Sequence, residues 1–158
     1  MCVGVLACSS PASPGDPQNV ALPPAGASPE VATAVVDLTN AERTRGGVAA
    51  LAASARLMQA AQLHAEQLAQ AGRLDHVLPN ARYPRPEDRL AAVSYRWQAY
   101  AENVAFGQRT AAEVVNGWMQ SPGHRANIMN PTYTEMGAGY ARDASGRSYW
   151  VQVFGKPL

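Results

Sequence analysis

The chain has 158 residues, a length that predicts one globular domain, and 47% of them are hydrophobic, enough for an ordinary core. Thirteen basic residues face twelve acidic ones, so the basic excess expected of a nucleic-acid-binding protein is missing. No apolar run in the sequence approaches the roughly 20 residues that a membrane-spanning helix needs. Both cysteines lie within the first eight residues, which leaves the rest of the chain without a cysteine for a disulfide or a metal site.

Residues 1–8 form a short apolar run that resembles the tail of a bacterial signal peptide. The segment around Cys8 is similar to a lipobox, in which this cysteine would be acylated and become the mature N-terminus. Leu6 departs from that pattern, because a smaller residue is usual there. The alternative interpretation is a disordered cytoplasmic N-terminus. Residues 9–28 are rich in Pro, Ser, Gly and Ala, and we expect them to form a flexible tether.

The first part of the domain is predicted to be helical. Ser28 as N-cap and Pro29 at the first helical position predict a helix that runs to about Arg45, where a pair of glycines follows. Ser54 is expected to cap a second helix, at about residues 55–71. Gly72 ends it, because glycine readily adopts the left-handed conformation of a helix C-terminus.

Two further helices are predicted in the middle of the chain. Residues 86–92 indicate a short one. Thr110 and Glu113 have the spacing of a capping box, which predicts that a fourth helix begins there. This helix carries Trp118 toward the core, and we expect it to end at Pro122.

The last part of the chain is typical of strands. Residues 136–142 and 148–154 read as β-strands, and residues 143–146 between them indicate a turn, so a hairpin is predicted. Residues 100–106 indicate either another strand or an extended cleft wall. Helices followed by an antiparallel hairpin favour the α+β class, with helices covering a sheet.

Three residues are the candidates for chemistry. His76 and His124 are placed on connections, where functional side chains concentrate. Glu102 lies in an apolar stretch, so its carboxylate needs a partner, either a histidine or Arg125. His64 falls on the apolar face of the second helix and is interpreted as a packing residue.

These three side chains leave the chemistry open. Two imidazoles and a carboxylate suit a divalent metal such as zinc, although their spacing matches no local metal motif. They suit equally a metal-free acid–base pair, with Glu102 and His124 as the candidate catalytic residues, or a static hydrogen-bonded cluster. The sequence has no G-x-S-x-G, no H-E-x-x-H and no cysteine beyond Cys8. Composition and spacing therefore do not show an enzyme.

Four segments occur in an order that resembles a known family. They are Leu38–Arg43, Ala101–Asn103, Trp118–Met129 with its W-M-x-S-P-G-H-R string, and Tyr149–Gly155. Together they look like the bacterial branch of the CAP superfamily, which unites cysteine-rich secretory, antigen 5 and pathogenesis-related proteins and whose domains are also called SCP domains. The resemblance spans roughly residues 30–158.

The resemblance implies a three-layer α-β-α sandwich, with a small antiparallel sheet between helices and a cleft on one side. His76 and Glu102 match the family's first cleft histidine and glutamate, and His124 matches a histidine of bacterial members. Three more positions are expected in the cleft: Asn103, Tyr149 and Gln152. The second glutamate and second histidine of the family are replaced by Ser121 and Tyr149, so zinc binding by the full tetrad does not transfer.

We therefore expect residues 29–158 to form an extracytoplasmic CAP domain, secreted or anchored to the bacterial envelope by a lipid. It is expected to be a monomer that binds an envelope ligand, whether lipid, peptide or glycan, through the His/Glu cleft. No nucleic acid partner and no required cofactor are expected. One alternative is a hydrolase of peptides or esters, metal-assisted or acid–base. The other is a purely structural polar cluster.

Overall fold

The computed structural model describes residues 29–158. The expected signal-peptide remnant at 1–8 with Cys8, and the expected tether at 9–28, lie outside the described residues. The elements follow in chain order as α1 (Pro29–Arg45), β1 (Ala52–Ala53), α2 (Ala55–Ala71), α3 (Pro86–Ala92), β2 (Trp97–Phe106), α4 (Ala111–Gln120), α5 (Pro122–Ile128), β3 (Glu135–Arg142) and β4 (Ser148–Pro157). No helix in this part of the chain is both long enough and apolar enough to cross a bilayer.

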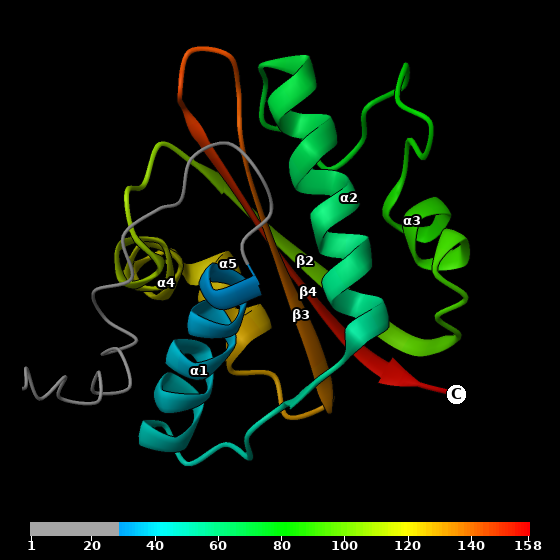
Figure 1. The fold of residues 1–158 in the computed structure, drawn as a ribbon. Helices are drawn as coiled ribbons and strands as arrows, with labels where there is room; N and C mark the ends of the chain where they lie inside the picture. Colours follow the sequence, from blue (N-terminus) through cyan, green and yellow to red (C-terminus); the bar gives the residue numbers. More distant parts are fainter. Residues whose placement is uncertain (1–28) are drawn as a thin grey trace, which may run out of the picture.

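The strands form one sheet in the order β1-β3-β4-β2. β3 and β4 are the predicted hairpin, and β2 pairs antiparallel with β4, so the uncertain 100–106 segment is an edge strand. The two-residue β1 pairs parallel with β3, which makes the sheet mixed rather than wholly antiparallel. Helices α1, α4 and α5 lie on one side of the sheet, and α2 and α3 on the other (Figure 1). This is the expected α-β-α sandwich.

Side-chain alternation along β4 divides the core into two layers. Trp150 and Phe154 pack into the cluster beneath α1 and α4. Tyr149, Val151 and Val153 point the other way and pack against α2. The period-two pattern of a strand predicts this division, because successive side chains point to opposite faces of a sheet.

Most helix ends follow the local signals. Gly72 adopts the left-handed conformation with φ 63°, and the Thr110 hydroxyl accepts a hydrogen bond from the Glu113 N–H at 3.1 Å. Ser54 is the N-cap residue of α2, as predicted, although its hydroxyl makes no capping hydrogen bond. Pro122 does not simply end α4. It opens the short helix α5, because proline is preorganised for a first helical turn.

Candidate functional site

The carboxylate of Glu102 is the centre of the candidate site. It projects from β2 toward the α2 layer, and its side chain is only 4% exposed. Arg89 of α3, itself 1% exposed, donates from Nη2 to both carboxylate oxygens, at 3.2 and 3.0 Å. The same nitrogen also donates to the main-chain oxygen of His76 at 3.1 Å. Arg89 therefore neutralises the buried charge and also fixes the segment that follows α2.

Two histidines complete what we term the histidine–glutamate cluster, composed of His64, His76, Arg89 and Glu102. His76 places Nδ1 at 2.9 Å from Glu102 Oε1, while half of its side chain remains exposed. The buried His64 lies on α2, with Nε2 at 2.9 Å from the Asp75 carbonyl oxygen and 3.5 Å from Glu102 Oε1. The cluster thus reaches solvent through His76.

The electrostatics of the cluster separate the protonation states of its members. Burial opposes ionisation of Glu102, but the hydrogen bond from His76 and the charge and hydrogen bonds of Arg89 outweigh it and hold the Glu102 pKa below its usual value. The hydrogen bond to Glu102 raises the pKa of His76. Burial lowers the pKa of His64. The arrangement favours an ionised Glu102, a protonated His76 and a neutral His64.

His124 comes from the opposite layer, where its main chain is hydrogen-bonded to Asn103, the residue that follows Glu102. It lies on α5 rather than on a connection, so that part of the sequence prediction is wrong. Its burial and the charge of His76 both lower its pKa. The pKa of His124 is thus lowered, whereas that of His76 is raised.

Asn103 holds the main chain at His124. Its amide donates to the His124 carbonyl oxygen at 3.2 Å and to Gln152 Oε1 at 3.1 Å, and it accepts from Asn127 at 2.8 Å. Gln152 donates in turn to Thr39 of α1 at 2.6 Å. Asn103 and Gln152 are fully buried. Both were expected to line a cleft, but here they position α5 from below the surface.

Tyr149 does not join these residues. It pairs with Phe106, at the end of β2 away from the Glu102 position, and its side chain is buried. Its hydroxyl donates to the Asp143 carboxylate at 3.2 Å. The expectation that Tyr149 lines the cleft is therefore not met, because it lies four residues along β4 from Val153, the residue paired with Glu102, and its side chain is buried in the α2 layer.

Comparison with known proteins identifies the family to which this fold belongs. The model of the cysteine-rich secretory protein family, CAP, matches residues 36–154. The chain belongs to the CAP family. The uncharacterized protein YkwD of Bacillus subtilis (strain 168) is 38% identical to the CAP domain over 120 residues, which cover 76% of this chain and 45% of YkwD. The uncharacterized membrane protein YlbC of the same organism is 31% identical over 120 residues, 76% of this chain and 33% of YlbC.

Solved structures support the same assignment. An extracellular protein containing a SCP domain from Bacillus anthracis (str. Ames) matches with a TM-score of 0.71 and 25% identity, over 79% of this chain and 40% of that one. An outer surface protein of Borrelia burgdorferi shares the fold, with a TM-score of 0.71 and 21% identity, over 80% of this chain and 92% of that one. The CAP domain spans less than half the length of YkwD, YlbC and the Bacillus anthracis protein.

The expected metal ligands do not fit a divalent cation in the CAP domain. Both oxygens of Glu102 are engaged by the Arg89 guanidinium group, whose charge repels a cation at that position. Within residues 29–158, no group of three His, Cys, Asp or Glu side chains is arranged to hold a metal ion. A metal bound by His76, Glu102 and His124 would require Arg89 to move.

Two members of the histidine–glutamate cluster, Arg89 and His64, were not predicted from the sequence as site residues. The prediction that Glu102 pairs with a histidine is confirmed by His76, whereas its buried cationic partner is Arg89 rather than the other candidate, Arg125. A signal was present, because Arg89 precedes the buried Leu90 and lies on the same short helix. His64 packs in the core as predicted, and its contact with Glu102 could not be seen from helix periodicity alone.

Proposed function

We propose that this protein is an extracytoplasmic binding module that recognises a ligand of the bacterial envelope through His76 and His124, with Glu102 and Arg89 as supports. In the same proposal the chain is secreted, or anchored through a lipid on Cys8. The description of the Bacillus anthracis relative as an extracellular protein supports the location. A lipid, a peptide or a glycan of the envelope could serve as the ligand.

The proposal depends on one observation: the half-exposed imidazole of His76 is held by the buried carboxylate of Glu102. Its Nδ1 is held by Glu102, and no described residue bonds its Nε2. Such a support restricts the ring before a ligand arrives, which lowers the entropy lost on binding. A protonated His76 donates from Nε2, whereas a neutral His124 retains one accepting nitrogen. Together they suit a ligand that carries both a hydrogen-bond acceptor and a donor.

Co-sedimentation of the full chain tests the proposal. The probes are purified bacterial cell-wall sacculi in one arm and phospholipid vesicles in the other. We expect binding in one arm, and we expect His76→Ala and His124→Ala each to weaken it by about tenfold, the effect of losing one hydrogen bond. Thr44→Ala, on the exposed face of α1, is the control and should bind as the parent does. Undiminished binding by the double variant would exclude this site and leave the cluster a structural role.

The opposite pKa shifts of the two histidines favour a second candidate, an acid–base hydrolase. A neutral His124 would take a proton from water as the water oxygen attacks a carbonyl carbon. A protonated His76 would donate a proton to the leaving group as its bond to that carbon breaks. Turnover of p-nitrophenyl acetate and of a fluorogenic peptide should follow a bell-shaped pH profile and vanish in His124→Ala. Equal rates for the parent and this variant would refute the candidate.

A further inference from the structure

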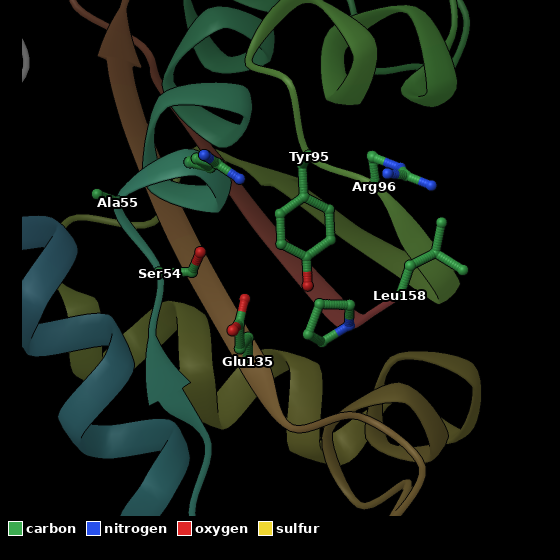
Figure 2. Close-up of a pocket in the computed structure, with 8 residues that line it drawn as sticks. Ser54, Ala55, Tyr95, Arg96, Glu135 and Leu158 are labelled. Carbon is green, nitrogen blue, oxygen red and sulfur yellow. The ribbon is translucent and has the colours of Figure 1, made fainter.

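A second candidate site lies away from the histidine–glutamate cluster, at the N-terminal end of α2. A pocket of about 630 Å³ opens there between the start of α2, the segment before β2 and the ends of β3 and β4. This volume falls within the range of pockets that hold small molecules. Figure 2 shows its polar lining, with Ser54 and Glu135 on one side of the Tyr95 ring and Arg96 and Leu158 on the other.

Opposite charges line this pocket without pairing. Arg56 and Arg96 supply two exposed guanidinium groups, and Glu135 supplies a carboxylate. Neither arginine forms an ion pair with Glu135 or with another carboxylate of residues 29–158. A wall with separated charges of both signs is complementary to a ligand that also carries both signs.

The buried hydroxyl of Tyr95 provides a second, independent observation at this pocket. The side chain of Tyr95 is 5% exposed, and its hydroxyl makes no well-formed hydrogen bond within the described residues, although it lies close to the Glu135 carboxylate. The hydroxyl faces Glu135, and burial together with that carboxylate raises the pKa of Tyr95. A buried hydroxyl with only this loose contact to Glu135 retains hydrogen-bonding capacity, which a ligand that enters beside Glu135 can use.

The backbone makes room for the Tyr95 hydroxyl. A Cβ atom at Gly155 of β4 would lie 2.3 Å from its oxygen, which is too close for any side chain. Glycine at this position therefore allows the ring to lie flat over the strand and to present its hydroxyl between Glu135 and the end of β4 (Figure 2).

The start of α2 adds donors on the positive side of the pocket. Ser54, the N-cap residue, makes no side-chain capping bond, so its hydroxyl does not occupy the first N–H groups of the helix. The positive end of the helix dipole favours an anion at the same place. Two guanidinium groups, a hydroxyl and helix N–H groups exceed what the two oxygens of a carboxylate can accept, whereas a phosphate group offers more acceptor oxygens.

We propose that this pocket binds a phosphoryl-amine zwitterion, such as a phosphoethanolamine group. Arg56, Arg96 and the start of α2 hold the phosphate, Glu135 holds the ammonium group, and Tyr95 contributes its hydroxyl. The ligand is either a free small molecule or the headgroup of a lipid. The site is separate from the cluster, because His76 follows the other end of α2.

Calorimetric titration of the full chain with three probes tests the pairing of charges. We expect O-phosphoethanolamine to bind about tenfold more tightly than inorganic phosphate or ethanolamine, since only the first satisfies both sides of the pocket. Arg56→Gln should weaken the binding of phosphoethanolamine and of inorganic phosphate alike, whereas Glu135→Gln should weaken the binding of the two amines and not that of inorganic phosphate. Phosphoethanolamine binding no tighter than phosphate, or unchanged in both variants, overturns the proposal.

Control variants test whether the effects are specific to this pocket, and lipid vesicles test whether the ligand is a lipid headgroup. Arg109→Gln removes another exposed arginine and should leave binding unchanged, and so should His76→Ala, which separates this site from the envelope-ligand site. Tyr95→Phe keeps the ring and should weaken phosphoethanolamine several-fold, because one hydrogen bond is lost. Vesicles containing phosphatidylethanolamine, compared with phosphatidylcholine alone, identify the source. Selective capture indicates the lipid headgroup, and binding confined to O-phosphoethanolamine in solution indicates a free ligand.

Discussion

Among the individual side chains, Glu102 and Arg89 form an ion pair in the interior of the domain. Both charged groups are almost completely buried, and each satisfies the other. A buried ion pair adds little net stability compared with apolar packing, but removal of one partner leaves an uncompensated charge in a poorly polarisable interior. The consequence of substitution here should therefore exceed that of any exposed ion pair on the same molecule.

Glu102→Gln tests this difference. The amide keeps the shape of the side chain but leaves the Arg89 charge without a counter-ion, so we expect the free energy of unfolding to fall by about 3 kcal/mol in urea titrations. Glu42→Gln is the matched control, because Glu42 pairs with the largely exposed Arg45 and solvent screens that pair. Equal losses in the two variants would show that the buried pair has no special role.

The three histidines should titrate in a defined order. NMR titration of the imidazole carbon-bound protons should place the pKa of His76 above its ordinary 6.5 and those of His64 and His124 below it. The stability that protonated His76 contributes is full below pH 6.5 and is lost as the pH rises through its folded-state pKa. In Glu102→Gln the His76 pKa should drop, because its hydrogen-bonded counter-ion is gone. A His76 pKa lower than those of His64 and His124 would contradict this arrangement.

Among the secondary-structure elements, α2 and β3 make an unusually close contact. Gly137 and Gly139 are spaced by two along β3, so both face α2. A Cβ at Gly139 would lie 2.3 Å from the main-chain carbon of Ala61, and one at Gly137 would lie 2.1 Å from Leu57. The close approach also lets Gln62 of α2 bond both the N–H and the carbonyl of Tyr140. The helix side chain thereby satisfies part of the strand's free edge.

Gly139→Ala should separate these two elements. The added methyl group meets helix backbone that cannot move aside alone, so we expect a loss of about 1–3 kcal/mol in unfolding free energy. Gly117→Ala makes the same change in α4, where nothing lies within 4 Å of the new carbon. Because alanine favours helix over glycine, that control should gain roughly 0.5–1 kcal/mol. Changes of the same sign in both variants would contradict the close packing.

The elements themselves were largely predictable from the sequence, for a physical reason. Caps, left-handed glycines and strand alternation act within a few residues, so the bounds of α3 and the hairpin of β3 and β4 follow from local patterns. The pairing of Arg89 with Glu102 and the start of α5 at Pro122 depend on tertiary packing. In the site, the importance of Glu102 was predictable from its apolar surroundings, but the identity of its cationic partner was not.

Across the molecule, the edge strand β2 links the two helical layers. The consecutive residues Glu102 and Asn103 point to opposite faces of the sheet, as strand geometry requires. Glu102 holds His76 from the α2 layer, while Asn103 holds the main chain of His124 from the α5 layer. A single rigid strand therefore sets the distance between two imidazoles that come from different layers.

Gln152→Ala tests whether the buried chain of amides positions His124. It removes the bonds from Gln152 to Asn103 and Thr39, and should lower the unfolding free energy by about 1–3 kcal/mol because buried polar groups lose partners. The NMR signals of the His124 ring should shift, while those of His64 in the other layer should not. Val151→Ala is the matched control, because it opens a cavity on the opposite face of the same strand. It should lower the unfolding free energy by about 2 kcal/mol and leave the His124 signals unchanged. If both variants shift His124 equally, general loosening of β4 rather than the amide chain controls its position.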